Sequence, residues 1–352
     1  MRVLVTGAAG FIGFGTVRAL LRQNHEVFGI DSLNEYYDPE LKRGRLRELG
    51  PEWIPHFRKL DISDALALRE AFNEWKPTHV VHLAAQAGVR YSLDHPEAYV
   101  SSNLVGFANM LECCRQFNVK HFVFASTSSV YGASQQLPFS EHSVADHPIS
   151  FYAATKKANE MMAHSYASLY RIPSTGLRFL TVYGPWGRPD MALFKFTQAI
   201  LAGGRPIEVY NNGQMMRDFT YVDDIVEGIV RTLAQPATPN ASWDASMPDP
   251  ATSSAPYRIF NIGNSQPIEL MRYVEVLEEC LGKKADIQLK PMQLGDVQVT
   301  YADTTELQKA IHYKPQTPIE VGVQRFVDWY REYYITGNGD EALARLGFER
   351  GR

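Results

Sequence analysis

Apolar residues in the first half of the chain form short continuous runs, and longer segments with helical spacing separate them. The runs have the length of buried strands and lie at 2–6, 26–30, 57–60, 79–83, 121–125 and 175–180. The segments with helical spacing lie at 14–23, 64–75, 96–117 and 150–170. Strands that alternate with helices of this length predict an α/β fold with a parallel, doubly wound sheet.

The pattern becomes less regular in the second half of the chain. Residues 181–192 are rich in turn formers and predict an active-site loop, whereas 234–256 is rich in Pro, Ala and Ser and predicts a long surface loop. An Asn-Gly pair at 212–213 predicts a hairpin that joins 207–210 to 214–219. The remaining elements that we expect are a helix at 194–201, a strand at 258–262 and a helix at 268–281.

Composition and charge agree with a soluble globular protein that forms two domains or one large α/β unit. The 352 residues are 45% hydrophobic and 21% charged with a formal net charge of −4, which indicates neither a nucleic-acid-binding surface nor a basic membrane face. The three cysteines, Cys113, Cys114 and Cys280, have neither disulfide nor zinc spacing, so no metal is expected. The sequence opens on a strand and has no apolar run of spanning length, from which we expect a cytoplasmic protein.

A glycine-rich turn follows the first strand. Gly7, Gly10 and Gly13 form G-x-x-G-x-x-G, in which small residues let a pyrophosphate approach the backbone and the helix N-terminus offers free N–H groups. Asp31 ends the second strand, where a carboxylate accepts hydrogen bonds from the adenosine ribose and repels a 2′-phosphate. The turn and the acid together predict a Rossmann-like domain that binds NAD rather than NADP.

Further residues lie at the carboxyl ends of strands, where ligands gather in such a fold. Asp61 and Ile62 end the third strand and are placed for the adenine edge. Leu83, Ala84 and Ala85 end the fourth strand. We therefore expect both segments to line the cofactor site.

Tyr152 and Lys156 form a Tyr-x-x-x-Lys pair in the expected helix at 150–170. Positions i and i+4 share one helix face, so the phenol and the ammonium can serve one site. The pKa of a free tyrosine is about 10, and a nearby ammonium lowers it, which favours a phenolate base. Hydroxyl groups at 126–129 follow the fifth strand and can complete a proton relay. Beside a nicotinamide these groups predict hydride transfer, although the pair alone would also suit an amphipathic helix with a surface lysine.

These motifs together resemble the extended short-chain dehydrogenase/reductases, a family of nucleotide-sugar epimerases, dehydratases and decarboxylases. The resemblance covers nearly the whole chain and rests on Gly7-x-x-Gly10-x-x-Gly13, Asp31, Asp61-Ile62, Leu83-Ala84-Ala85, Ser126-Thr127-Ser128-Ser129-Val130-Tyr131-Gly132 and Tyr152-x-x-x-Lys156. It implies that Tyr152 is the catalytic base, that Lys156 binds the nicotinamide ribose and lowers the pKa of Tyr152, and that Thr127 is the catalytic hydroxyl.

The resemblance further implies a tightly bound NAD⁺. The residues that it places in the cofactor site are Gly7, Gly10, Phe11, Ile12, Gly13, Asp31, Asp61, Ile62, Leu83, Ala84, Ala85, Tyr152 and Lys156. No second cofactor and no metal follow from it.

The second half of the chain carries the resemblance that concerns the substrate. Arg217 matches the family residue that contacts the diphosphate, and Asp296 matches one that accepts from a ribose hydroxyl. Segment 185–192, which contains Arg188, is similar to that of UDP-glucuronate 4-epimerases, as is 87–90. Residues 179–181 depart from the Tyr-Phe-Asn usual in UDP-galactose 4-epimerases, which argues against UDP-glucose. The substrate-binding residues implied are Arg90, Thr127, Ser128, Thr181, Arg188, Arg217 and Asp296.

The resemblance therefore implies C4 epimerisation of UDP-glucuronate to UDP-galacturonate. Tyr152 takes the proton of the 4-hydroxyl, the C4 hydride passes to NAD⁺, and the 4-keto sugar turns so that the hydride returns to its other face. The transient intermediate is a β-keto acid that is liable to lose CO2. We expect Thr181 and Arg188 to hold its carboxylate in a geometry that prevents this loss.

Three alternatives remain open at this point. The same scaffold can carry a UDP-glucuronate decarboxylase that forms UDP-xylose, or an epimerase of a neutral UDP-hexose. A NAD-sensing protein without catalysis is a third, against which the complete set of Thr127, Tyr152 and Lys156 argues.

The expected organisation is two domains and a homodimer. Residues 1–180 form the NAD-binding domain, segments near 215–262 return to it, and 181–352 form a smaller mixed α/β domain for the nucleotide sugar. The family resemblance implies dimerisation through the helices near 95–118 and 150–170, although apolar faces there would equally suit the core of one chain.

Overall fold

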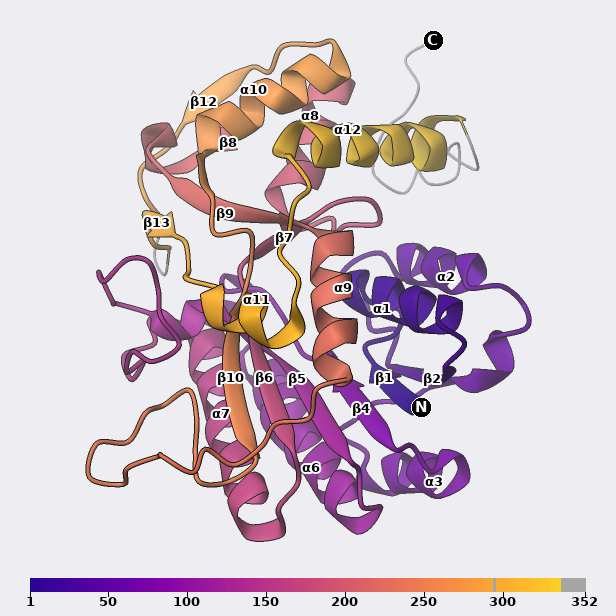
Figure 1. Cartoon of the computed structure of the whole chain (residues 1–352). Helices are drawn as coiled ribbons and strands as arrows, with labels where there is room; N and C mark the ends of the chain where they lie inside the picture. Colours follow the sequence, from indigo (N-terminus) through magenta and orange to yellow (C-terminus); the bar gives the residue numbers. More distant parts are fainter. Residues whose placement is uncertain (294–295, 337–352) are drawn as a thin grey trace.

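The computed structural model describes residues 1–293 and 296–336. Its largest element is a sheet of seven parallel strands in the order β10-β6-β5-β4-β1-β2-β3 (Figure 1). These strands are β1 (Arg2–Thr6), β2 (Glu26–Asp31), β3 (Phe57–Lys59), β4 (His79–His82), β5 (His121–Thr127), β6 (Ser174–Phe179) and β10 (Tyr257–Ile262). The order confirms the predicted doubly wound sheet. It reverses at β1, and ligands bind beside such a reversal at the carboxyl ends of the strands.

Successive residues of a strand face opposite sides of the sheet, so the continuous apolar strands place apolar side chains on both faces. Helices cover both of these faces. In β1, Val3 and Val5 belong to the apolar cluster of α1 (Phe11–Arg22) and α9 (Val222–Leu233). Leu4 belongs instead to the cluster on the other face. The helices of that second cluster are α3 (Ala65–Trp75), α6 (Gly106–Gln116) and α7 (Phe151–Tyr170). Burial on both faces explains why the strands appear in the sequence as continuous apolar runs.

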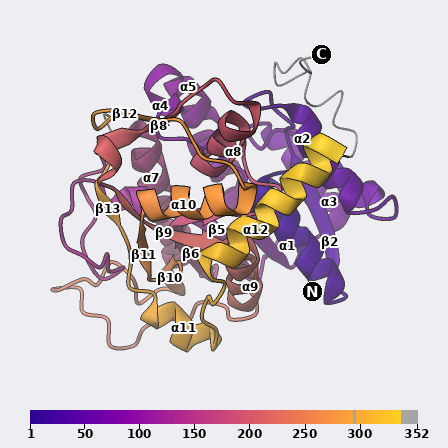
Figure 2. The same ribbon diagram turned by 90° about the horizontal axis from the view of Figure 1, so that it is seen from above.

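The second half of the chain builds a smaller mixed part. Its central strand β9 (Met216–Tyr221) pairs in antiparallel fashion with β11 (Pro267–Glu269) and in parallel with β7 (Thr181–Tyr183) and β13 (Val299–Thr300). A separate parallel pair consists of β8 (Ile207–Val209) and β12 (Ile287–Leu289). Three packed helices lie over this part in Figure 2, namely α8 (Ala192–Ala202), α10 (Leu270–Leu281) and α12 (Ile319–Tyr330).

The chain crosses between the two parts more than once. It enters the smaller sheet with β7 and β9, returns with α9 against α1, and adds β10 beside β6 in the large sheet. Short helices complete the fold at α2 (Pro39–Glu48), η1 (Ile54–His56), α4 (Tyr91–Asp94), α5 (Pro96–Tyr99), η2 (Val100–Val105), η3 (Ser128–Tyr131), η4 (Tyr210–Gly213), α11 (Thr305–Ile311) and η5 (Arg331–Thr336). Among the helices of the described residues, none has the length and apolar character needed to cross a membrane.

The predicted hairpin at 207–219 is wrong. Asn211 and Asn212 do adopt left-handed conformations, with φ of 50° and 51°, as a tight hairpin turn requires. The strands on either side nevertheless pair with distant partners, β8 with β12 and β9 with β7, β11 and β13. The local turn signal is correct, but long-range sheet pairing decides which strands become neighbours.

Two other differences concern helices. The expected helix at 96–117 is interrupted by one π-helical stretch, η2, between α5 and α6. Five α-helices of the described residues, α2, α4, α9, α11 and α12, form in segments for which no element was predicted. Of these, α2 bears on the site described next, because it follows the loop that begins at Asp31.

Candidate active site

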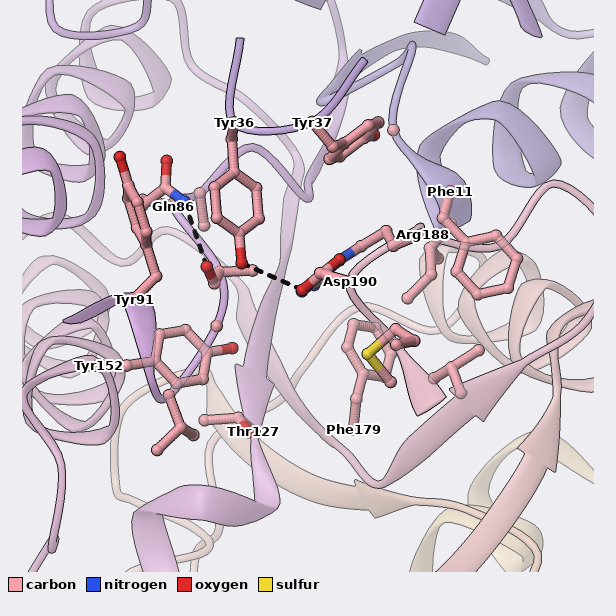
Figure 3. A pocket seen from close by; sticks show the side chains of 18 of the residues that line it. Phe11, Tyr36, Tyr37, Gln86, Tyr91, Thr127, Tyr152, Phe179, Arg188 and Asp190 are labelled. Carbon is pink, nitrogen blue, oxygen red and sulfur yellow. Dashed lines mark hydrogen bonds and ion pairs between the residues drawn. The ribbon is translucent and has the colours of Figure 1, made fainter. Parts of the chain in front are cut away.

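A cavity of about 920 Å³ lies at the carboxyl ends of the large sheet's strands, between them and the smaller part. Every residue that the sequence analysis placed in a cofactor or substrate site lines it. These residues are Gly7, Gly10, Phe11, Ile12, Gly13, Asp31, Asp61, Ile62, Leu83, Ala84, Ala85, Arg90, Thr127, Ser128, Tyr152, Lys156, Thr181, Arg188, Arg217 and Asp296. The fold thus gathers residues from both halves of the chain around one space, part of which Figure 3 shows.

The glycine turn forms one end of the cavity. The N–H of Gly10 donates to the carbonyl oxygen of Gly7 at 2.8 Å, and Gly7 has a φ of +70°. A Cβ on Gly7 would lie 2.9 Å from the backbone nitrogen of Ala84, and one on Gly13 would lie 2.0 Å from the oxygen of Gly7. Gly10 precedes α1 without a side-chain cap, so the first N–H groups of the helix are left for a ligand. This close, uncapped turn fits the pyrophosphate of a dinucleotide.

Asp31 occupies the end of β2 beside this turn. It is buried, and its carboxylate accepts hydrogen bonds from the N–H of Ala9 at 3.1 Å and of Leu33 at 2.9 Å. Lys42 of α2 also lines the cavity, and its amine donates to the backbone and side-chain oxygens of Asn34. Burial lowers the pKa of Lys42 to about 8, and the charge of Asp31 opposes that shift. Lys42 was not predicted as a site residue, because the segment after Asp31 has no clear pattern of a helix or strand.

Tyr152 and Lys156 occupy the first two turns of α7. Ser150 caps this helix as predicted, since its Oγ accepts from the N–H of Ala153 at 3.1 Å. Thr127 ends β5, and its hydroxyl donates to Ser129 Oγ at 3.2 Å and is near enough to the Tyr152 phenol to act on its pKa. Strand end and helix start therefore bring the phenol, the amine and the hydroxyl to the same cavity, and Figure 3 shows the Tyr152 and Thr127 side chains close together there.

Burial dominates the electrostatics of these groups. It raises the pKa of Tyr152 above 10.0, while the Arg188 guanidinium and the nearby Thr127 hydroxyl oppose the rise. It lowers the pKa of Lys156 to about 8, against the charge of Glu160. The Arg188 guanidinium is thus a cation that acts on the phenol in this structure, and the role that the resemblance implies for Lys156 stays a prediction.

A buried ion pair lies near these groups. The Arg178 guanidinium contacts Glu160 through two hydrogen bonds of 2.8 Å, and the Ser126 hydroxyl donates to the same carboxylate at 2.6 Å. Both charged side chains are fully buried. The arrangement joins the carboxyl end of β5 to α7 and thereby fixes the distance between Thr127 and Tyr152.

Arg188 faces Tyr152 from the loop after β7, but its guanidinium already has a partner. Asp190 accepts from Arg188 in a bidentate contact, with Nε to Oδ1 at 2.9 Å, and also accepts from the Tyr36 hydroxyl at 3.0 Å (Figure 3). The charge of Asp190 contributes to raising the pKa of Arg188, and Arg188 contributes to lowering that of Asp190. Neither Asp190 nor Tyr36 was singled out from the sequence, since each is an ordinary polar residue in a loop.

The far end of the cavity carries the residues proposed for the nucleotide. Arg217, in β9, donates to the carbonyl oxygens of Val297 at 2.7 Å and Gln298 at 2.9 Å. Arg90 pairs with Asp296 at 3.4 Å. The expected motif around Asp296 includes residues 294–295, which lie outside the described residues. Within the described part of the chain, no group of three or more His, Cys, Asp or Glu side chains could hold a metal ion.

Fold and site together define a dinucleotide-dependent enzyme that acts on a carbon bearing a hydroxyl group. The comparison with known families agrees: residues 3–263 match the NAD dependent epimerase/dehydratase family. The chain belongs to this family.

Individual relatives are similar over almost the whole chain. A Rhizobium meliloti protein described as a probable UDP-glucuronate 4-epimerase is 48% identical over 337 residues, 95% of this chain and 98% of the relative. The UDP-glucuronic acid 4-epimerase of Bacillus cereus, solved with UDP-glucuronic acid and NAD, matches with a TM-score of 0.83 and 31% identity over 95% of this chain and 100% of its own. A Thermus thermophilus UDP-glucose 4-epimerase solved with NAD reaches a TM-score of 0.80 and 31% identity, at 95% and 100% coverage. Since the fold is common to enzymes of both sugars, the substrate must be argued from the site.

Proposed function

We propose that the chain is an NAD-dependent UDP-glucuronate 4-epimerase, which interconverts UDP-glucuronate and UDP-galacturonate. The observation that carries the proposal is that one cavity is lined by the glycine turn, by Thr127, Tyr152 and Lys156, and by Arg188 and Thr181. The first two suit oxidation of a sugar hydroxyl, and the third supplies donors for a carboxylate.

In this proposal Tyr152 takes the proton of the sugar 4-hydroxyl and later returns it, and Thr127 donates to the reacting oxygen. NAD, when bound, accepts the C4 hydride and gives it back. Lys156 binds the nicotinamide ribose, while the glycine turn and Asp31 hold the pyrophosphate and the adenosine ribose. Asp61 and Ile62 contact the adenine, and 83–85 line the same groove.

The 4-keto sugar is the point at which two reactions compete. Breaking the C5–CO2 bond sends its electron pair toward C5 and the C4 ketone, and the resulting enolate takes up a proton. This happens only when the breaking bond is aligned with the ketone π system, so a carboxylate held in another orientation is protected. Arg188 and Thr181 are the groups proposed to hold it, with Ser128 as a further donor.

The substrate's nucleotide is proposed to bind at the other end of the cavity. Arg217 supplies a planar guanidinium for the diphosphate, since such a group pairs bidentately with phosphate oxygens. Asp296 accepts from the uridine ribose, and Arg90 lies beside it at the cavity mouth. The large sheet would thus form the cofactor domain and the smaller part the nucleotide-sugar domain, with α9 and β10 returning to the former.

The test is a proton NMR spectrum of purified protein mixed with UDP-glucuronate, without added NAD. UDP-galacturonate is the expected product, because retained NAD is regenerated in each cycle. UDP-pentose would identify a decarboxylase instead. An unchanged spectrum, the same as that of a Tyr152→Phe control, would leave only an NAD-binding role.

One observation favours a second candidate, an epimerase of a neutral UDP-hexose. The Arg188 charge is compensated by Asp190, so the sugar end of the cavity offers less net attraction to an anion than the sequence suggests. Turnover of UDP-galactose with a higher kcat/KM than UDP-galacturonate would establish this candidate.

The role of Arg188 has its own test. An Arg188→Ala variant should lose roughly ten- to 150-fold in affinity for UDP-glucuronate, because a charge-assisted hydrogen bond contributes roughly 1.5–3 kcal/mol. It should also release more decarboxylated product. If both affinity and product ratio equal those of the wild type, the role assigned to Arg188 is wrong.

We further propose a cytoplasmic homodimer. Adjacent segments η2 and α7 expose apolar side chains, namely Val100, Val105, Met161 and Leu169, of which Leu169 is 70% exposed. Such side chains suit a face that a second copy covers. All three cysteines are free, which suits a reducing compartment.

A further inference from the structure

Arg45, in α2, is a buried cation that the proposed mechanism does not use. It is 0% exposed and donates five hydrogen bonds within the described residues. All five end on uncharged oxygens, four on backbone carbonyls and one on the hydroxyl of Tyr37. Burying a charge is costly unless its hydrogen-bond donors are satisfied. The groups that accept hydrogen bonds from Arg45 therefore indicate its role.

The carbonyls that Arg45 holds belong to two distant segments. Nη1 donates to the oxygen of Ala9, inside the glycine turn, at 2.8 Å. Nη2 donates to Trp186 at 2.7 Å and to Gly187 at 3.4 Å, and Nε donates to Trp186 at 3.2 Å. Gly187 directly precedes Arg188. One rigid guanidinium therefore joins the cofactor-binding turn to the segment that carries the substrate-facing cation.

The segment in question adopts a conformation that needs support. Trp186 has a φ of +63°, in the left-handed region that residues with a Cβ avoid. Its ring packs against Phe14, Trp329 and Tyr333, with centroid distances of 5.7, 5.2 and 4.8 Å. Ring packing fixes the side chain, while Arg45 fixes the carbonyl on the other side. Such strain persists only where the surroundings determine the conformation, and it is common at functional sites.

A second contact ties the same two segments together. Tyr36, in the loop that leads to α2, donates to Asp190, which holds the Arg188 guanidinium in its bidentate contact. The backbone before Arg188 is thus fixed by Arg45, and the side chain of Arg188 is fixed through Asp190 and Tyr36. Both supports come from the chain between Asp31 and the end of α2.

We propose that Arg45 is a positioning residue for Arg188 and that, by holding the Trp186 and Gly187 carbonyls, it sets the partition of the keto acid between epimerisation and loss of CO2. The proposal rests on the proposed function. When Arg188 moves, the carboxylate is free to turn until its bond to C5 aligns with the ketone. The C5–CO2 bond then breaks, its electrons form the enolate, and a solvent proton at C5 gives the UDP-4-ketopentose.

The experiment compares Arg45→Met and Arg45→Lys with the wild type. The methionine removes all donors, whereas the lysine keeps the charge but has no planar fork with which to reach both segments. The matched control is Trp53→Phe, which removes a buried hydrogen bond of 2.9 Å from Nε1 to the oxygen of Val27 without touching 184–190. Thermal unfolding establishes that each variant folds. If Arg45→Met does not fold, the comparison is made with Arg45→Lys alone.

Two readouts are taken, product ratio by NMR and amide hydrogen exchange of 184–190 with NAD present. Both Arg45 variants should raise the ratio of decarboxylated to epimerised product by about threefold or more, as coupled neighbours commonly do. In an Arg188→Ala background the same substitutions should have no further effect on the ratio. Exchange of 184–190 should be faster in the Arg45 variants than in Trp53→Phe.

An unchanged product ratio overturns the proposal, even if exchange becomes faster, since Arg45 would then support the backbone without acting on the chemistry. An equal rise in Trp53→Phe, or an undiminished effect without Arg188, also overturns it. If the wild type converts no UDP-glucuronate, the proposed function fails and the effect on partition fails with it. The tie between Arg45 and 184–190 is then still judged by exchange.

Discussion

At the scale of single residues, burial disfavours the charged forms of Tyr152 and Lys156 that the proposed mechanism requires. Burial raises the pKa of the phenol and lowers that of the amine, although the proposed mechanism needs the phenolate and the ammonium. The opposing groups are the Arg188 guanidinium for Tyr152 and the Glu160 carboxylate for Lys156. In the proposed mechanism these two residues therefore depend on neighbours that do not themselves exchange protons with substrate.

Replacing Tyr152 by Phe should abolish the base while keeping the ring. We expect kcat to fall by about 10²- to 10⁴-fold, the usual contribution of general acid–base catalysis, with NAD still retained. Steady-state assays measure kcat, and absorbance of the bound cofactor measures how much NAD is retained. Tyr166→Phe, on the same helix, is the control and should keep activity; a Tyr152→Phe enzyme with wild-type kcat would exclude the assigned base.

Replacing Lys156 by Met should stabilise the protein and inactivate it. The folded pKa of about 8 lies below the ordinary 10.5, so the unfolded chain binds more protons between these values and wild-type stability rises with pH across that window. Below about pH 8 the buried ammonium costs on the order of 3 kcal/mol, at about 1.4 kcal/mol per pKa unit, and methionine removes this cost.

Urea unfolding at pH 7 and pH 10.5 measures the effect. At pH 7 the variant should have the higher free energy of unfolding, and its difference from the wild type should become smaller at pH 10.5. NAD retention and turnover should both be lost. A gap that is the same at both pH values, or a variant that keeps NAD and turnover, would contradict the assignment of Lys156.

At the scale of elements, α7 shows how a local signal positions the side chain proposed as the base. Ser150 caps the helix, and Tyr152 follows within its first turn. Ser150→Ala should cost about 1 kcal/mol of stability, the usual value of an N-cap. Because the first turn frays, kcat should fall more than the affinity for NAD.

Denaturant unfolding and steady-state kinetics test this expectation, with Ser150→Asp as the control. Aspartate is an equally good cap and should restore both quantities. Equal losses in the alanine and aspartate variants would mean that the serine acts through something other than the helix end.

Elements also show what could and could not be predicted from the sequence. The strands β1, β2, β4, β5 and β6 and the helix α7 were predicted because both faces of each strand are buried and the helix has a clear cap. The hairpin at 207–219 was mispredicted, because a turn signal specifies a local bend and not a distant strand partner.

The site residues divide in the same way. The glycine turn and Tyr152 stand in motifs with fixed spacing, so the sequence reveals them. Arg45, Asp190 and Tyr36 act through contacts that span up to 154 positions, from Tyr36 to Asp190. A contact of that kind exists only once the fold brings the segments together, so the local sequence pattern does not predict it.

At the scale of the whole molecule, the apolar residues exposed on α7 concern assembly. Leu169→Glu would place a charge in the proposed interface, where burying it without a partner is costly. In light scattering we expect this variant to be a monomer and the wild type to be a dimer. Leu66→Glu is the matched control, since Leu66 is 69% exposed on α3; monomers in both variants, or in neither, would place the interface elsewhere.

The late return of β10 to the large sheet has a consequence for how the chain is made. β6 is complete at Phe179, but its outer neighbour begins only at Tyr257. At ordinary ribosomal rates of about 5–20 residues per second, β6 has an unpaired edge for roughly 4–16 s before β10 is synthesised. The face of α1 that α9 covers is also exposed for part of that time. Open edges recruit foreign strands. Synthesis, more than the finished molecule, is therefore where this enzyme is most exposed to aggregation, and a chain stopped near residue 180 would carry that hazard permanently.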